Sequence, residues 1–265
     1  MKVTVLQIDA GRTGANQRWS LLESQARAHA MDGSDLLVWP ELFLSGYNVG
    51  DALHAHAEPS DGVFAERVQA LAQELGVAIL YGYPERADGQ VYNSALLVDS
   101  TGEVLINHRK TVLPDGIEPD RFGTGSDFTL VRLGAAIVAV MICYESEFPE
   151  AVRQVSAKGA DVVLVVTACA WDQVPNLVVP SRAYENGVFM VYANFCGVEN
   201  GHAFAGLSCI VDPYGNDLAR TGREEEAITA KLDLALVREA RARLPYLRDH
   251  GKIPRNPKFS KDSPR

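Results

Sequence analysis

The chain has 265 residues, of which 47% are hydrophobic and 22% are charged, and its formal net charge is −9. This composition is typical of a globular protein, and the negative charge disfavours a nucleic-acid partner, whose phosphates need a basic face. No apolar run reaches the roughly 18 residues of a membrane span, and the segment from Met1 to Leu6 predicts a strand instead of a signal sequence. We therefore expect a cytoplasmic protein with neither a nucleic-acid nor a membrane partner.

The first half of the chain alternates predicted strands with predicted helices. In chain order these are a strand at 2–8, a helix at 16–30, a strand at 35–39, a helix at 61–75 and a strand at 77–83. A hairpin follows, with arms at 92–98 and 104–109 around the turn Asp99-Ser100-Thr101-Gly102. The helices are predicted from apolar residues at helical spacing.

The second half repeats this order. We predict a strand at 137–142, a helix at 149–158, a strand at 161–166, a helix at 178–186, a strand at 188–194, a hairpin beginning at 207–211 and a last helix at 234–244. If the halves are equivalent, each contributes a sheet with helices on its outer face. The predicted fold class is therefore α/β, a four-layer α-β-β-α sandwich around one core.

Three residues with reactive side chains each follow a predicted strand. Glu41 stands between Pro40 and an apolar stretch, where a poorly solvated carboxylate could serve as a base, although a surface glutamate is an alternative. Lys110 ends the second hairpin arm, where a solvated lysine is the ordinary outcome. Cys143 follows residues 137–142, and Pro149 predicts a helix start nearby, whose dipole would favour a thiolate; a buried core cysteine is the alternative.

The four cysteines, Cys143, Cys169, Cys196 and Cys209, have no metal-ligand spacing. In a reducing compartment they should be free thiols, and we expect neither a metal nor a cofactor.

The strings around the three reactive residues resemble the three signatures of the nitrilase superfamily of carbon–nitrogen hydrolases. They are Pro40-Glu41-Leu42-Phe43-Leu44-Ser45-Gly46-Tyr47, Arg109-Lys110-Thr111-Val112-Leu113 and Cys143-Tyr144-Glu145-Ser146-Glu147-Phe148-Pro149-Glu150. The likeness covers almost the whole chain. It implies a nitrilase-like sandwich of two mostly six-stranded sheets, a homodimer or higher homo-oligomer, and a match between Glu118 and the family's second glutamate.

Two features of the resemblance bear on the substrate. The family commonly has aspartate where this chain has Glu145, and a histidine or aromatic residue in place of Val112 and Pro114, which puts the substrate pocket in doubt more than the chemistry. Tyr144 and the Glu-Phe-Pro-Glu continuation resemble amidases more than true nitrilases. Further strings resemble bacterial aliphatic amidases such as δ-aminovaleramidase, namely Ser45-Gly46-Tyr47-Asn48-Val49-Gly50, Tyr81-Gly82-Tyr83-Pro84-Glu85-Arg86 and Tyr92-Asn93-Ser94.

The chemistry of amide hydrolysis assigns roles to these residues. Cys143 is the expected nucleophile and Glu41 the general base, which later acts as acid towards departing ammonia and as base towards water. Lys110 and the backbone N–H of Tyr144 would hold the oxyanion, a donor of a kind typically worth ~3–4 kcal/mol of barrier. Glu118 would orient Lys110 or the substrate amide. The expected substrate pocket is formed by Tyr47, Glu145 and Trp171.

The predicted function is an amidase that converts a small aliphatic carboxamide to the acid and ammonia through a cysteine thioester. Hydrolysis of an N-carbamoyl group or a nitrile by the same residues is one alternative. Another is a catalytically silent dimeric binding protein, which would have no reason to retain all four of these site residues.

The chain is predicted to form one domain over residues 1–247, followed by a tail at 248–265. The tail contains Lys252, Arg255, Lys258, Lys261 and Arg265 together with Pro254, Pro257 and Pro264. Such a segment cannot form a core of its own. We expect either an arm that crosses onto the partner of a dimer or a frayed terminus.

Overall fold

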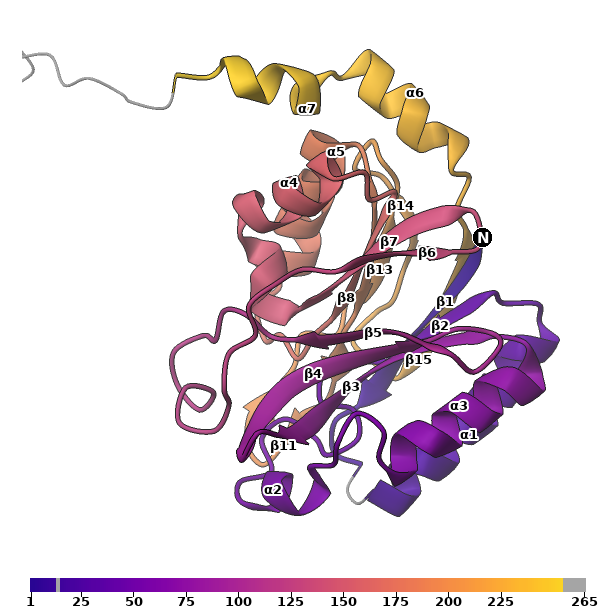
Figure 1. Ribbon diagram of the computed structural model, residues 1–265, viewed down its shortest axis with the longest axis vertical. Helices are drawn as coiled ribbons and strands as arrows, with labels where there is room; N and C mark the ends of the chain where they lie inside the picture. The colour runs from indigo at the N-terminus through magenta and orange to yellow at the C-terminus, as the bar shows by residue number, and fades with distance from the viewer. Residues whose placement is uncertain (13–14, 255–265) are drawn as a thin grey trace, which may run out of the picture.

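Two β-sheets lie face to face in the computed structural model, which describes residues 1–12 and 15–254 (Figure 1). The first sheet consists of β1 (Lys2–Asp9), β2 (Leu36–Val38), β3 (Ala78–Ala87), β4 (Gln90–Val98), β5 (Val104–Arg109), β10 (Phe195–Cys196) and β15 (Glu226–Lys231). The second consists of β6 (Leu130–Leu133), β7 (Ala136–Ile142), β8 (Val162–Val166), β9 (Phe189–Ala193), β13 (Cys209–Val211) and β14 (Asp217–Arg220). A short ribbon pairs β11 (Val198–Glu199) with β12 (His202–Ala203).

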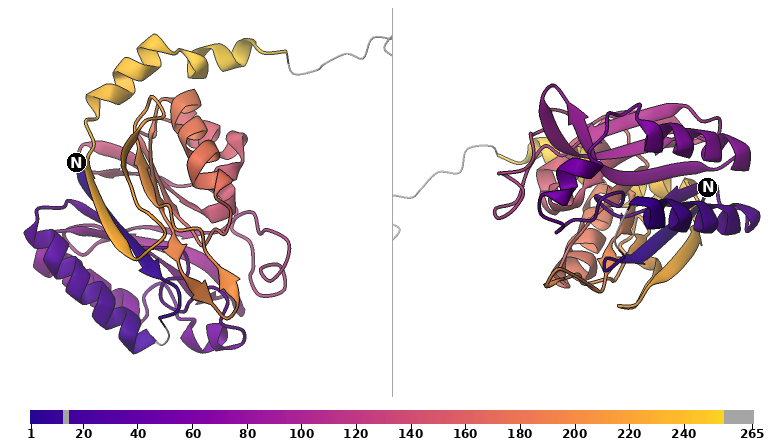
Figure 2. Two further views of the ribbon diagram at one scale, coloured as in Figure 1. Left: turned by 180° about the vertical axis from the view of Figure 1, so that it is seen from behind. Right: turned by 90° about the horizontal axis from the view of Figure 1, so that it is seen from below.

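Helices cover the outer face of each sheet. The first sheet is covered by α1 (Ala15–Met31) and α3 (Val63–Leu75), and the second by α4 (Pro149–Ala157) and α5 (Val179–Asn186) (Figure 1). The remaining helical segments are α2 (Ala52–His56), η1 (Cys143–Glu147), η2 (Val174–Val178), α6 (Ala235–Arg243), α7 (Tyr246–Asp249) and η3 (His250–Lys252). The helices α6 and α7 extend along the end of the molecule where α5 lies (Figure 2). Among the described residues, no helix is long and apolar enough to cross a membrane.

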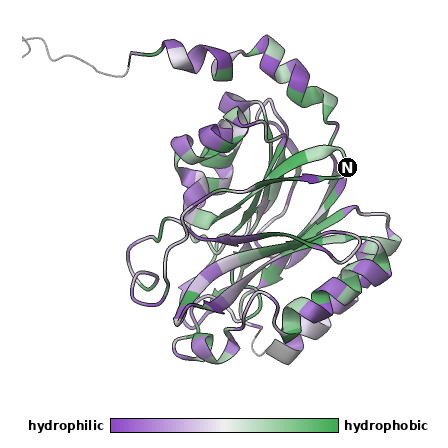
Figure 3. Ribbon diagram, viewed as in Figure 1, coloured by the Kyte–Doolittle hydropathy of each residue, from purple (hydrophilic) through white to green (hydrophobic). Residues whose placement is uncertain are grey.

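Strand alternation divides the apolar side chains into three layers. In β1, Val3 and Val5 face the opposite sheet, while Leu6 and Ile8 pack under α1 and α3. In β7, Val138, Val140 and Ile142 lie between the sheets, whereas Ala139 and Met141 face α4 and α5. Figure 3 shows apolar residues concentrated in the strands, with mixed polarity on the helices. The predicted α-β-β-α sandwich is confirmed.

The strand pairing confirms that the two halves are equivalent. In the first half, β1, β2 and β3 pair in parallel and are followed by antiparallel β4 and β5. In the second half, β7, β8 and β9 pair in parallel and are followed by antiparallel β13 and β14. An antiparallel strand flanks the first strand of each set, β15 beside β1 and β6 beside β7.

The first sheet differs from the expected six strands because it has seven. Two of them, β10 and β15, come from the second half of the chain and both pair with β1. Strand β15 has no clear signal in the sequence, because Ile228 is its one buried side chain. A strand at the margin of the core needs few apolar residues, so hydrophobic periodicity does not reveal it.

Candidate active site

The ends of three strands converge on one buried cluster. Glu41 follows β2, Lys110 follows β5 directly, and Cys143 follows β7 directly. Lys110 comes from the first sheet and Cys143 from the second, so the cluster lies between the sheets. The sequence placed these three residues after strands, and the structure brings them together.

Lys110 lies between two carboxylates. Its Nζ is 2.8 Å from Glu41 Oε1 and 2.7 Å from Glu118 Oε1, and all three side chains are buried. Burial alone would lower the pKa of Lys110, but the negative charges of Glu41 and Glu118 raise it above its ordinary value. The side chain is therefore held as an ammonium at neutral pH. It is a fixed cation between the sheets.

Glu118 is fixed from two sides. Its Oε1 accepts hydrogen bonds from Lys110 and, at 2.8 Å, from the Tyr47 hydroxyl. Burial raises the pKa of Glu118, and the nearby charge of Glu41 adds to this effect while Lys110 opposes it. Tyr47 also has a raised pKa because it is desolvated beside two carboxylates, so its hydroxyl remains a donor. The predicted pocket residue Tyr47 thus lies in the cluster.

Cys143 occupies a strained turn. Its backbone has φ +49°, in the left-handed region, at the first residue of η1. The predicted helix start at Pro149 is confirmed, but the expected thiolate is not, because burial and the charge of Glu41 raise the pKa of the Cys143 thiol well above its ordinary value. Lys110 opposes this shift with a smaller effect. The resting side chain is a thiol, and attack on a carbonyl requires a base to remove its proton.

The backbone at Glu41 is closely packed against β3. A Cβ added to Gly82 would lie 2.4 Å from the Leu42 backbone nitrogen and 2.7 Å from Glu41 Cα. Leu42 itself has φ +47°. Only glycine allows β3 to approach this closely, and the approach fixes where the Glu41 side chain begins.

Three buried acceptor atoms in the cluster have no protein partner among the described residues. They are Glu41 Oε2, Glu118 Oε2 and Asn93 Oδ1. A buried unpaired acceptor is costly, and its cost can be offset when a ligand supplies the donor. The cluster is therefore suited to a ligand group that carries N–H donors.

Asn93 is a site residue that the sequence argument did not single out. Asn93 lies in β4, and its side-chain Nδ2 donates to Glu41 Oε1 at 2.7 Å. Its backbone carbonyl accepts from the Lys110 backbone N–H at 2.8 Å. The available signal was a polar residue inside a predicted strand, two positions before the apolar stretch Ala95 to Val98. Asn93 holds both Glu41 and Lys110.

Glu145, predicted to line the substrate pocket, is instead enclosed in a network of its own. Its carboxylate accepts from the backbone N–H and the hydroxyl of Thr111, the backbone N–H of Ile142 and Nε2 of His108, at 2.6–2.8 Å. Burial alone would raise the pKa of Glu145, but these hydrogen bonds and the His108 charge hold it below its ordinary value. The side chain ties together the residues that flank Lys110 and Cys143.

The other two predicted residues lie in different settings. Tyr144 is the second residue of η1, where helical N–H groups lack an intrahelical acceptor, and its ring packs edge-on against Phe148. The Trp171 side chain is 70% exposed, and its backbone N–H donates to Cys169 Sγ. The structure therefore leaves Tyr144 available as a backbone donor and places Trp171 at the surface.

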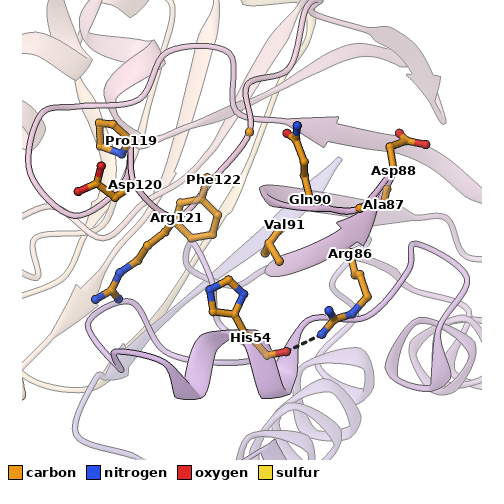
Figure 4. A pocket seen from close by; sticks show the side chains of 12 residues that line it. His54, Arg86, Ala87, Asp88, Gln90, Val91, Pro119, Asp120, Arg121 and Phe122 are labelled. Carbon is orange, nitrogen blue, oxygen red and sulfur yellow. Dashed lines mark hydrogen bonds between the residues drawn. The ribbon is translucent and has the colours of Figure 1, made fainter.

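A surface hollow of about 590 Å³ lies beside the loop that carries Glu118 (Figure 4). Its lining includes His54 from α2, Arg86 from β3 and Phe122 from the loop, and Arg86 donates to the His54 carbonyl. None of Glu41, Lys110 and Cys143 lines it. The hollow is thus distinct from the buried cluster.

Within the described residues, no group of histidine, cysteine, aspartate or glutamate side chains could hold a metal ion.

Comparison with known proteins identifies the family. The profile of the family described as carbon-nitrogen hydrolase matches residues 2–242. The chain is 45% identical over 221 residues to a protein of Pseudomonas protegens named "Hydrolase in pqqF 5'region", covering 82% of this chain and 78% of the relative. It is 35% identical over 252 residues to an (R)-stereoselective amidase of a Pseudomonas species, covering 94% and 91% of the two chains.

A solved amidase from Nesterenkonia sp. AN1 has the same fold. The structure of one of its mutants superposes with a TM-score of 0.82 at 31% identity, covering 92% of this chain and 98% of the amidase. In that structure acrylamide has added to the active-site cysteine. Another mutant structure of the same amidase contains butyramide. With the family profile matched over nearly its whole length, the chain belongs to the carbon-nitrogen hydrolase family.

Proposed function

We propose that the protein is an amidase that hydrolyses a small aliphatic carboxamide to the carboxylic acid and ammonia. The observation that carries this proposal is the buried arrangement of Lys110 between Glu41 and Glu118, with Cys143 under the influence of the same charges. The similarity to amidases supports it, since one relative is an (R)-stereoselective amidase and a solved neighbour was crystallised with butyramide.

The unpaired acceptors favour an amide over a nitrile. A primary carboxamide carries two N–H donors, which match the free Oε2 atoms of Glu41 and Glu118. A nitrile has no hydrogen-bond donor and would leave both carboxylate oxygens buried and unpaired. The substrate's NH₂ group would thus lie between the two glutamates, with its carbonyl carbon facing Cys143.

The reaction begins with transfer of the Cys143 proton to Glu41 as the sulfur attacks the carbonyl carbon. The developing oxyanion is held by the Lys110 ammonium and the Tyr144 backbone N–H. When the tetrahedral intermediate collapses, Glu41 returns the proton to the nitrogen, the C–N bond breaks, and ammonia leaves a thioester on Cys143. Glu41 then takes a proton from water as the water oxygen attacks the thioester. When this second intermediate collapses, the C–S bond breaks, the acid is released, and Glu41 returns the proton to the sulfur.

The test is an ammonia-release screen over a panel of short aliphatic amides, with the acid product measured in parallel. Cys143→Ala should reduce turnover below a hundredth of the wild-type rate without unfolding the protein, because the change removes one sulfur atom at a strand end. Matching nitriles and N-carbamoyl compounds form the comparison set. Release of ammonia by the alanine variant at more than that level would exclude Cys143 as the nucleophile.

We also propose that the protein is a cytoplasmic homodimer with one domain over residues 1–247. Support for the dimer comes from exposed apolar side chains near one another, Leu177 in η2, Tyr184 in α5 and Tyr246 in α7, the two tyrosine rings being 5.9 Å apart. The four cysteines are free, which fits a reducing compartment. Of the predicted arm at 248–265, residues 248–252 continue into helical turns, and residues 255–265 lie outside the described part of the chain.

A further inference from the structure

A second buried network connects α1 and the β11–β12 ribbon to Glu118. Glu199 is 2% exposed, and its Oε2 accepts hydrogen bonds from the backbone N–H groups of Tyr47 at 2.8 Å and Asn48 at 2.6 Å. Its Oε1 faces the guanidinium of Arg18, 3.4 Å away. Both charges are fully enclosed by protein. A buried carboxylate that binds two successive backbone N–H groups fixes the path of that backbone.

The loop is attached to the β11–β12 ribbon by further contacts. Asn48 and Asn200 exchange hydrogen bonds, each side chain donating to the other's backbone carbonyl, at 3.3 and 2.7 Å. The Tyr47 ring packs against His202 and Phe204, with centroids 6.0 and 6.1 Å away. The ring direction of Tyr47 is therefore set by the ribbon that carries Glu199.

Arg18 is fixed just as firmly. Its guanidinium lies between the rings of Phe43 and Phe195, 5.8 and 5.6 Å from their centroids, and it also donates to the carbonyls of Ala10 and Arg12. The side chain is 0% exposed. Glu199 thus faces a cation that cannot move away, and its carboxylate has one orientation available.

We infer that Glu199 is a positioning residue for the catalytic centre, an inference that rests on the proposed amidase function. It holds residues 46–48 so that the Tyr47 hydroxyl stays bonded to Glu118 Oε1. That bond, with the one from Lys110, commits Oε1 to protein donors and leaves Oε2 directed at the substrate amide. If the loop shifts, Glu118 can rotate, and the acceptor for the substrate nitrogen is no longer in place.

Gly46 allows this contact to be tested without removing a charge. Its φ is +91°, and a Cβ there would lie 2.3 Å from Glu199 Oε1. Gly46→Ala should therefore push the loop off Glu199. Gly50 is a matched control in the same loop, because it also has a left-handed φ, +61°, but a Cβ there would meet nothing within 4 Å.

The experiment is a double-mutant cycle with Tyr47→Phe. Gly46→Ala and Glu199→Gln should each lower kcat/KM for amide hydrolysis by about tenfold, as expected for loss of a hydrogen bond to a charged group. In the Tyr47→Phe background the same changes should have less than a twofold further effect, because they act through the hydroxyl already removed. Gly50→Ala should lose stability through its backbone strain but keep its kcat/KM within twofold of wild type.

The outcomes separate this inference from the proposed function. Wild-type protein that releases no ammonia from any amide would overturn the proposed function itself. If the wild type is active but each double variant loses kcat/KM by the product of the two single losses, the positioning role is refuted. Glu199 would then act independently of Tyr47. Circular dichroism and thermal melting of each variant identify any that fail to fold; if Glu199→Gln is one, the Gly46→Ala cycle decides.

Discussion

Replacement of Glu145 by glutamine tests whether this side chain holds the residues next to Lys110 and Cys143 in place. The carboxylate accepts four hydrogen bonds, from the backbone N–H and hydroxyl of Thr111, the N–H of Ile142 and Nε2 of His108. Glutamine offers one oxygen and one NH₂ group, so in either orientation its NH₂ must face two of these donors. At least one backbone N–H then loses its acceptor, that of Ile142 in a buried position or that of Thr111 in a partly buried one.

The expected loss can be worked out from these contacts. Each buried donor left unpaired costs about 1–3 kcal/mol, and two are affected, so the free energy of unfolding should fall by about 2–6 kcal/mol. For a chain of this size, at about 2–4 °C per kcal/mol, that corresponds to a decrease in Tm of roughly 4–24 °C. Because Thr111 adjoins Lys110 and Ile142 adjoins Cys143, their displacement should also lower kcat by roughly 10- to 100-fold.

The pH dependence identifies the ionised carboxylate as the cause. The hydrogen bonds hold the pKa of Glu145 below its ordinary value of 4.5, so its contribution to stability is complete above that value and is lost as the pH falls through the folded-state pKa. The stability difference between wild type and Glu145→Gln should thus be full at pH 7 and shrink below about pH 4.5.

Denaturant unfolding at pH 7 and pH 3, together with steady-state kinetics at pH 7, measures both effects. Asp212→Asn is a matched control, because Asp212 is also buried and accepts from two backbone N–H groups, those of Tyr214 and Asn216, but none of its partners adjoins a residue of the cluster. That variant should lose stability and retain kcat. An unchanged kcat in Glu145→Gln, or an equal stability loss at both pH values, would refute the reasoning.

Three further changes have defined outcomes. Lys110→Met leaves two buried carboxylates without their cation, so the free energy of unfolding should fall by about 3–5 kcal/mol and mass spectrometry should detect no acyl-enzyme; normal acylation would exclude the oxyanion role. Gly82→Ala places a methyl group against Leu42, so activity should fall far more than in Gly222→Ala, where a Cβ meets nothing within 4 Å; equal activities would contradict this. Truncation after Asp249 should weaken the proposed dimer in sedimentation, and high salt should reproduce part of that loss; an unchanged dimer at nanomolar concentration would mean the tail is only a terminus.

The sequence was most informative where structure is local. The strand at 137–142 and the hairpin arms at 92–98 and 104–109 agree closely with β7, β4 and β5, because alternation and turn residues are read within a few positions. The placement of Lys110 and Cys143 followed directly from those strand ends. Glu118 was identified only through the family resemblance, since the loop around it has no periodic pattern.

The parts that escaped prediction depend on contacts between distant residues. Glu145 and His108 are bonded although they are 37 positions apart in the sequence, and Glu199 and Tyr47 are 152 positions apart. No local sequence pattern predicts either pair. The expected Cys143 thiolate was wrong for a similar reason. A helix start is visible in the sequence, but the desolvation that raises the pKa of the thiol depends on how the second sheet packs against the first.

The pairing of β1 with β15 has a consequence for the synthesis of the chain. Lys2 pairs with Lys231, so one edge of β1 finds its partner only after the intervening residues 10–225 have been synthesised. At ~5–20 residues per second, that interval is roughly ten seconds to a minute. Throughout it, the nascent first sheet presents an open edge rich in valine, leucine and isoleucine, which is the kind of surface that chaperones bind and neighbouring chains can join.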